Sequence, residues 1–299
     1  MTKILLCHPL FLSQSPAEQA LKSPYFPLGL LYLAGYLRQQ GHHVAIFDGT
    51  FAEGPSAFAA RLATEQPDIV GIAALLPTKE SALHLADIAH QSGFTVVMGG
   101  PDPTREPQAY LAHPQVDLVV HHEGEQTLTA LLNLLDQQPL TPSLLQHELG
   151  VAYRNDNGEM IVNQPRPPIQ DLDTLPLPAR DLIEMDRYLD SWREDNGYAS
   201  LTISTSRGCP YGCEWCQDAV HGQELRQRSP QSVAAEVKLL QETYQLDRLR
   251  VVDDVDGLSR EWLEAWQAEA EAQAAVVPFE ALNDLARQDI PMLEVRDTL

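Results

Sequence analysis

The interpretation of this chain starts from the stretch Arg207-Gly208-Cys209-Pro210-Tyr211-Gly212-Cys213-Glu214-Trp215-Cys216. Three of the four cysteines of the chain lie here, within eight residues. Three thiolates at the spacing CxxxCxxC can bind one iron–sulfur cubane and leave its fourth iron without a protein ligand, and soft thiolates suit such a cluster. Trp215, next to the last cysteine, is expected to shield the cluster from water.

A structural zinc site is the alternative interpretation of the same cysteines. Zinc ordinarily takes four ligands, often from two CxxC-type pairs. The nearest fourth candidate here is His221, five residues after Cys216, so the spacing favours the iron–sulfur cluster. The remaining cysteine, Cys7, ends an apolar run and is expected to be a small core residue.

The residues around the cysteines alternate between strand and helix patterns. We expect strands at 201–207, 248–252 and 276–282, and helices at 230–244 and 260–274. Strands that alternate with helices indicate a parallel arrangement. Residues 196–299 are therefore predicted to form a partial (β/α) barrel, truncated to about three strand–helix units out of six.

Residues 1–135 show the same alternation over a longer span. Apolar strand patterns at 3–7, 43–47, 68–75, 95–98 and 117–121 are each followed by a helical pattern. Strands that are apolar almost throughout are typical of a parallel sheet covered on both faces. We expect an α/β domain with a doubly wound, Rossmann-like parallel sheet.

Residues 136–195 interrupt this pattern. Two strand-like runs at 151–154 and 160–163 flank Asn155-Asp156-Asn157-Gly158, which indicates a hairpin. The prolines that follow are typical of an extended connector. We therefore place a hairpin and proline-rich connector at 136–195, between the two α/β regions.

Composition excludes some functions. The formal net charge of −22 argues against a nucleic-acid surface, which needs clustered lysine and arginine. No apolar run approaches the length of a transmembrane helix, and the first residues lack the layout of a signal peptide. Clustered cysteines indicate a metal site in a reducing compartment rather than disulfides. We expect a cytoplasmic protein.

An open parallel sheet binds ligands at the carboxyl ends of its strands. The residues that follow the strands of the first region are therefore the binding candidates, although turn and cap roles would explain the same residue types. The candidates are His8, Pro9, Leu75, Thr78, Gly99, Gly100, Pro101, Asp102, Thr104, Glu123, Gly124 and Glu125. The two glycines, without side chains, would let the backbone approach a bulky ligand.

The cysteine motif, with an aromatic residue before its third cysteine and a strand upstream, resembles the radical S-adenosylmethionine superfamily. The resemblance implies that Cys209, Cys213 and Cys216 bind a [4Fe–4S] cluster whose open iron binds S-adenosylmethionine. It also implies that Asp253 and Asp254 lie where the family accepts the amino group of that cofactor.

The first region resembles the cobalamin-binding domain found ahead of radical S-adenosylmethionine domains, as in the anaerobic magnesium-protoporphyrin ester cyclase and cobalamin-dependent methylases. The similarity rests on residues 27–34 (PLGLLYLA), 99–104 (GGPDPT) and 123–127 (EGEQT), and on the connector at 171–181. The chain departs from the family in three ways, one of which is the early end of its barrel. The DxHxxG motif is absent, so we expect no protein histidine on cobalt. Asp102 replaces a histidine, and His121-His122 precede Glu123.

These resemblances imply an enzyme that binds cobalamin and a [4Fe–4S] cluster and cleaves S-adenosylmethionine, for methyl transfer or radical ring chemistry on a small-molecule substrate. Two alternatives remain. One is a non-catalytic cobalamin and iron–sulfur binding or regulatory protein. The other is a chain that completes its barrel with a second copy or a partner chain, because a half barrel leaves an open edge. We expect no nucleic-acid partner and no membrane span.

Overall fold

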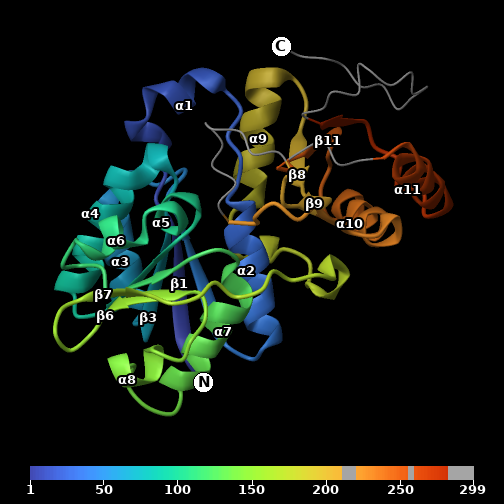
Figure 1. Ribbon diagram of the computed structural model, residues 1–299. Helices are drawn as coiled ribbons and strands as arrows, with labels where there is room; N and C mark the ends of the chain where they lie inside the picture. The colour runs from blue at the N-terminus through green and yellow to red at the C-terminus, as the bar shows by residue number, and fades with distance from the viewer. Residues whose placement is uncertain (211–219, 255–258, 282–299) are drawn as a thin grey trace.

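Residues 3–162 supply the strands of one sheet in the computed structural model, which describes residues 1–210, 220–254 and 259–281 (Figure 1). The sheet order is β2-β1-β3-β4-β5-β6-β7. The first five strands are parallel and the last two antiparallel. Their bounds are β1 Lys3–His8, β2 His43–Asp48, β3 Ile69–Ala73, β4 Thr95–Gly99, β5 Leu118–Val120, β6 Val151–Arg154 and β7 Met160–Val162.

Helices cover both faces of this sheet, which confirms the expected α/β fold. Alternate residues of β1 explain why: Ile4 and Leu6 belong to one apolar cluster, and Leu5 and Cys7 to another. Helices α2 (Leu28–Gln39) and α7 (Gly124–Leu135) pack on the first face, and α3 (Pro55–Glu65), α4 (Lys79–Gln91) and α6 (Pro107–Leu111) on the second (Figure 1). Cys7 is fully buried, as expected of a core residue. Shorter helical segments are η1 Leu12–Gln14, α1 Pro16–Leu21, η2 Leu76–Thr78, α5 Pro101–Arg105 and α8 Pro142–Leu145.

A second parallel sheet has the order β12-β11-β8 within the described residues. Its strands are β8 Ser200–Ile203, β11 Arg248–Val251 and β12 Phe279–Ala281, and helices α10 (Pro230–Thr243) and α11 (Arg260–Ala272) cover one face. Trp266 of α11 lies 4.8 Å from the Phe279 ring, between centroids. A short antiparallel ribbon of β9 (Ser206–Arg207) and β10 (Arg226–Gln227) follows β8.

The segment between the sheets contains more regular structure than its prolines indicate. The predicted hairpin exists, and it extends the first sheet through pairing of β5 with β6. Beyond η3 (Leu172–Thr174) and η4 (Arg180–Leu182) lies α9, at Met185–Asn196. The sequence analysis did not identify α9, although its buried residues Met185, Tyr188, Leu189 and Trp192 have helical spacing.

Helix α2 packs against the connector that leads from the first sheet to the second. The Leu31 carbonyl accepts a hydrogen bond of 3.0 Å from the Ala179 amide of the connector. A Cβ atom on Gly35 would lie 2.7 Å from the Leu177 carbonyl oxygen, so only glycine admits this approach. On α9, the Tyr188 hydroxyl donates to Asp48 of β2 at 2.6 Å. One apolar cluster runs from Ile4 of the first sheet to Phe279 of the second. The second sheet therefore has a fixed place relative to the first.

Within the described residues, the longest helices are too short or too polar to cross a bilayer.

Two glycines of α2 predict opposite effects of the same substitution. Gly35→Ala forces the helix away from Leu177, and overpacking of this kind costs roughly 1–3 kcal/mol of unfolding free energy. Gly29 has no atom within 4 Å of the position its Cβ would occupy. Gly29→Ala should therefore be neutral, or stabilising by up to about 1 kcal/mol through helix propensity. Urea unfolding of both variants checks this pair, and equal stabilities would contradict the packing at Gly35.

Candidate functional site

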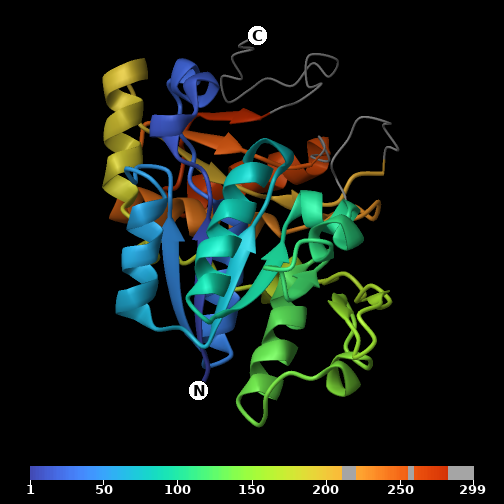
Figure 2. The ribbon, with the colours of Figure 1, turned by 90° about the vertical axis from the view of Figure 1, so that its left-hand side faces the viewer.

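A cavity of about 630 Å³ lies between the two sheets. Figure 2 shows the second sheet beyond the carboxyl ends of the first sheet's strands. The strand ends of β1, β3, β4 and β5 form one wall, the start of α2 forms another, and the uncovered face of the second sheet closes the space. The order of the strands reverses at β1 and β3, which is where open α/β sheets bind ligands.

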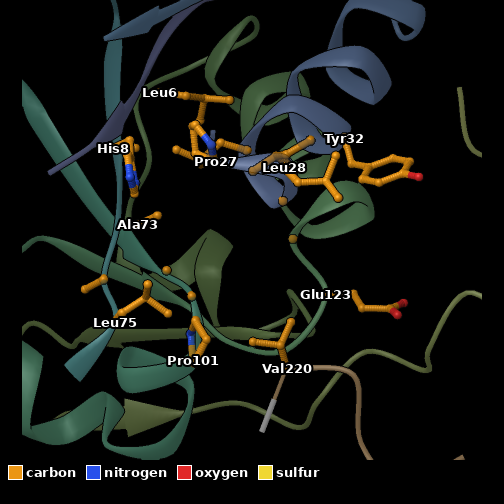
Figure 3. A pocket seen from close by; sticks show the side chains of 18 of the residues that line it. Leu6, His8, Pro27, Leu28, Tyr32, Ala73, Leu75, Pro101, Glu123 and Val220 are labelled. Atoms are coloured by element: carbon orange, nitrogen blue, oxygen red, sulfur yellow. The ribbon is translucent and has the colours of Figure 1, made fainter. Parts of the chain in front are cut away.

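Most binding candidates from the first sheet lie on this cavity. They are His8, Leu75, Thr78, Gly99, Gly100, Pro101, Glu123, Gly124 and Glu125 (Figure 3). Three others lie behind the wall. The carbonyl oxygen of Pro9 accepts a hydrogen bond from Ser81 Oγ at 2.6 Å. Asp102 accepts one from the Tyr110 hydroxyl at 2.6 Å, and Thr104 Oγ1 accepts one from the His122 amide at 3.0 Å.

Asp102 is at the position where the family described above often has histidine. Its carboxylate interacts with other side chains of this chain. Besides Tyr110, the ammonium group of Lys79 lies 3.4 Å from its carboxylate. Burial and Asp102 together raise the pKa of Tyr110 well above its usual value, so the phenol keeps the proton it donates. Asp102 therefore braces the loop after β4.

His8 brings a buried polar group to the cavity wall. Its side chain is only 8% exposed, and Nε2 has no hydrogen-bond partner within the described residues. Burial lowers the pKa of His8, and the nearby Asp48 partly opposes this shift. The imidazole is therefore neutral near pH 7 and able to exchange a hydrogen bond with an amide or hydroxyl of a ligand.

Packing within the chain also constrains the glycines of the cavity. Gly100 has φ +99°, and a Cβ atom there would lie 2.9 Å from the Ala74 carbonyl oxygen. Its lack of a side chain is thus required by packing against the end of β3, not only by a ligand. Gly99 would meet Val120 O at 3.4 Å. Gly29 of α2, which lines the cavity but was not among the candidates, faces open space.

The second sheet brings alternate positions of β8 and β11, and of the residues just after each strand, to the cavity. Thr202, Ser204, Arg250, Val252 and Asp254 line the cavity. Thr202 is buried, and its hydroxyl has no hydrogen-bond partner within the described residues. Arg250 is its register partner in β11 and likewise has no hydrogen bond or salt bridge to a described residue. The sequence analysis missed this face, which the period-two alternation of the two strands could have indicated.

The two aspartates after β11 are placed differently. Asp254 lies on the cavity, and its Oδ2 accepts a hydrogen bond from the Gly208 amide at 3.0 Å. Asp253 accepts one from the Thr205 amide at 2.7 Å and also binds the Thr205 hydroxyl. Both carboxylates therefore fix the backbone just ahead of Cys209, and only Asp254 borders the cavity.

Of the three cysteines, the structure describes Cys209. It is 5% exposed, and its amide donates to the Gly222 carbonyl at 3.0 Å. Gly208 has φ +87°, and a Cβ there would lie 2.2 Å from the Glu224 carbonyl oxygen, so its lack of a side chain is required by protein packing. Cys213, Trp215 and Cys216 lie outside the described residues. Within the described ranges, no three His, Cys, Asp or Glu side chains come together as a metal site.

The carboxylates of Glu123 and Glu125 are engaged by arginines. Figure 3 shows the Glu123 side chain directed away from the space that His8, Leu75 and Val220 surround. Burial would raise the pKa of Glu123, but hydrogen bonds from His221 and the Ile169 amide, with Arg207 and Arg226, lower it to about 2. Glu123 is therefore ionised at every physiological pH.

The model of the B12-binding domain family matches residues 19–132. An uncharacterized methyltransferase of Pyrococcus horikoshii is 34% identical over 267 residues, which cover 86% of this chain and 54% of the relative. The anaerobic magnesium-protoporphyrin IX monomethyl ester cyclase of Rubrivivax gelatinosus is 28% identical over 263 residues, which cover 86% of this chain and 46% of that protein. The chain thus spans about half the length of these curated relatives.

Two solved structures have the same fold. The cobalamin-dependent S-adenosylmethionine radical enzyme OxsB, with aqua-cobalamin and S-adenosylmethionine bound, matches with a TM-score of 0.75 at 20% identity, over 94% of this chain and 38% of its own. The radical S-adenosylmethionine methyltransferase TsrM of Kitasatospora setae, with cobalamin and a [4Fe–4S] cluster bound, matches with a TM-score of 0.72 at 17% identity, over 94% and 54%.

Ionised Glu123 predicts a specific sensitivity to acid. Its pKa of about 2 in the folded chain lies below the ordinary 4.5. The contribution of ionised Glu123 to stability is therefore complete above its pKa in the unfolded chain. It is lost as the pH falls toward its pKa in the folded chain. Between about pH 5 and pH 2.5, the unfolding free energy of wild type should fall by on the order of 2 kcal/mol more than that of Glu123→Gln. Urea titrations at several pH values measure this, and parallel curves would contradict it.

Proposed function

We propose that this chain, whose residues 19–132 match the model of the B12-binding domain family, binds cobalamin between its two sheets and is a radical S-adenosylmethionine protein. The observation that carries the proposal is the position of the cavity. It joins the strand ends of the B12-binding domain to the face of the second sheet from which the chain runs into Cys209. A macrocycle there would lie near Arg207 and Asp254, which border the cavity just ahead of Cys209.

The walls of the cavity fit a large, flat and mainly apolar ligand with polar edges. Leu28, Leu33 and Val97 give apolar surface, while Gly29 leaves room for a ring system. His8 offers a neutral imidazole whose buried nitrogen lacks a protein partner, suited to an amide of the ligand's rim. We propose that cobalamin binds there and that no histidine of the chain is a ligand of its cobalt.

The cluster is assigned to Cys209, Cys213 and Cys216 from their spacing and resemblance. When bound, cobalamin and a reduced cluster supply methyl-transfer or radical chemistry. The chain's own residues bind and orient the reactants. Asp254 fixes the Gly208 amide ahead of the cysteines. Arg250 lines the cavity beside its register partner Thr202, and neither side chain has a hydrogen bond or salt bridge to a described residue; a carboxylate of S-adenosylmethionine or of the substrate would be held there.

The reaction we propose is methyl transfer or a radical ring closure on a small-molecule substrate, in a reducing compartment such as the cytoplasm, where thiolate ligands persist. The curated relatives include methyltransferases and ester cyclases. A non-catalytic binding protein that retains both cofactors is the alternative. Release of 5′-deoxyadenosine from S-adenosylmethionine by the reduced, reconstituted chain favours the enzyme, and its absence with both cofactors bound favours the alternative.

We also propose that a second protein chain contacts the second sheet at the edge of β12. Within the described residues, β12 pairs with β11 on one side and leaves its other edge unpaired. Unpaired strand edges are templates for association. A second copy or another chain would cover this edge, and light scattering of the reconstituted chain distinguishes a dimer from a monomer.

Filling the cavity from Gly29 should block cobalamin. The Cβ position of Gly29 has no atom within 4 Å, so Gly29→Phe should keep the fold while the ring fills the cavity and the affinity for hydroxocobalamin falls at least tenfold. Gly29→Ala adds one methyl group and is the matched control, expected to change the affinity by less than threefold. Absorbance titration measures both dissociation constants. Equal binding by Gly29→Phe and wild type would place cobalamin elsewhere.

The cysteine motif should determine iron content. Anaerobically reconstituted wild type is expected to hold about four irons per chain with the broad absorption of a [4Fe–4S] cluster. Simultaneous replacement of Cys209, Cys213 and Cys216 by Ala should abolish this iron, because the thiolates are its ligands. Cys7→Ala, in the core of the first sheet, should leave it unchanged. Stoichiometric zinc without iron in wild type would contradict the assignment.

A further inference from the structure

Two buried arginines face each other where the chain enters and leaves the cysteine segment, which we define as residues 208–225 between β9 and β10. Arg207 of β9 and Arg226 of β10 are direct register partners in the antiparallel ribbon. Their side chains are 9% and 3% exposed. Like charges directly opposite one another destabilise a strand pair, and buried charges are costly unless they are compensated. This ribbon therefore depends on negative charge from outside itself.

That charge comes from the B12-binding domain, from Glu123 on the loop after β5 and from Glu125 in the first turn of α7. Glu123 Oε1 lies 2.8 Å from Arg226 Nη1 and 3.5 Å from Arg207 Nη1. Glu125 Oε1 accepts a hydrogen bond from Arg207 Nη2 at 2.7 Å. The two carboxylates thus compensate the two guanidinium groups, and all four side chains are buried.

The same network fixes both ends of the cysteine segment. Arg207 lies two residues before Cys209, whose amide donates to Gly222 O at 3.0 Å. Arg226 Nη2 donates to the His221 carbonyl at 2.9 Å, and Arg226 Nη1 to the Ile169 carbonyl of the connector at 2.7 Å. The Ile169 amide in turn donates to Glu123 Oε2 at 2.7 Å. Glu123 is therefore the common acceptor for β10, the connector and the cysteine segment.

From this geometry we infer that Glu123 and Glu125 are positioning residues that clamp the base of the cysteine segment to the wall of the cobalamin cavity. The inference rests on the proposed function only in naming the two cofactors that the clamp aligns. It revises the role expected from sequence, in which both glutamates were cofactor contacts. Residues 123–125 and 207–209, two motifs more than eighty positions apart, are the two halves of one ion-pair network.

A clamp of this kind matters because paired cofactor sites on separate elements lose function when their supports loosen by a fraction of an ångström. Arginine–carboxylate pairs are directional, since the planar guanidinium donates along fixed lines. Glu123→Gln keeps the shape and removes the charge, so the two facing arginines then repel. Glu125→Gln removes one contact and is the milder variant.

Hydrogen exchange on the full chain without cofactors tests the clamp independently of the proposed function. Glu123→Gln should raise the exchange rates of the Cys209 and Arg226 amides at least tenfold, and Glu125→Gln should raise them less. Neither variant should change the exchange rates in α3 and α4. The control is Asp181→Asn, which breaks the exposed Arg38–Asp181 pair and should not alter exchange at Cys209.

The reconstituted protein supplies the second readout. Both Gln variants should bind hydroxocobalamin within threefold of wild type, while the electron paramagnetic resonance signal of the reduced cluster changes shape and S-adenosylmethionine no longer shifts it as in wild type. Unchanged exchange and an unchanged cluster signal would overturn the clamp. So would a tenfold loss of cobalamin affinity with normal exchange, because the glutamates would then be cofactor contacts. A wild-type chain that binds neither cofactor would overturn the proposed function and leave the exchange test of the clamp valid.

Discussion

The carboxylate of Glu236 lies fully buried between two arginines, and the relative placement of the two sheets depends on this ion triplet. Arg180 of the connector lies 2.8 Å from Glu236 Oε1, and Arg228 binds the other oxygen. Arg228 also donates to the Tyr32 hydroxyl of α2 at 3.2 Å. Burial opposes ionisation of Glu236, but Arg180 and Arg228 hold its pKa below the usual value. A charge this deeply buried is stable only while both partners remain, so connector, α10 and α2 are held together.

The cavity follows from that placement. Strand ends of a parallel sheet present loops and free backbone groups, and the second sheet presents its uncovered face to them. A second set of buried ion pairs, from Glu123 and Glu125 to Arg207 and Arg226, ties the rim of the cavity to the cysteine segment. The strongly acidic chain thus uses several of its arginines in buried ion pairs, where they determine geometry. Arg250 differs, because it faces the cavity without a described ion-pair partner.

Much of this fold could be predicted from sequence because its signals are local. The apolar runs that became β1, β3 and β4, and the Asn-Gly turn between β6 and β7, each depend on neighbouring residues. The cavity loops followed from the rule for parallel strands. The arginine–glutamate pairs could not be predicted, because they join residues about 50 to 100 positions apart and depend on the docking of the sheets. The packing of Gly100 on Ala74 could not be predicted for the same reason, since this contact exists only once β3 and β4 pair.

The central claim is that one cavity, built from both sheets, binds cobalamin. Hydrogen exchange of the full chain with and without hydroxocobalamin tests it most directly. The account predicts slower exchange on both sides together, at residues 27–33 and 73–78 of the first wall and at residues 202–204 and 250–252 of the second sheet, with no change in α3. Protection confined to the first sheet, or absent from both, would contradict a shared cavity.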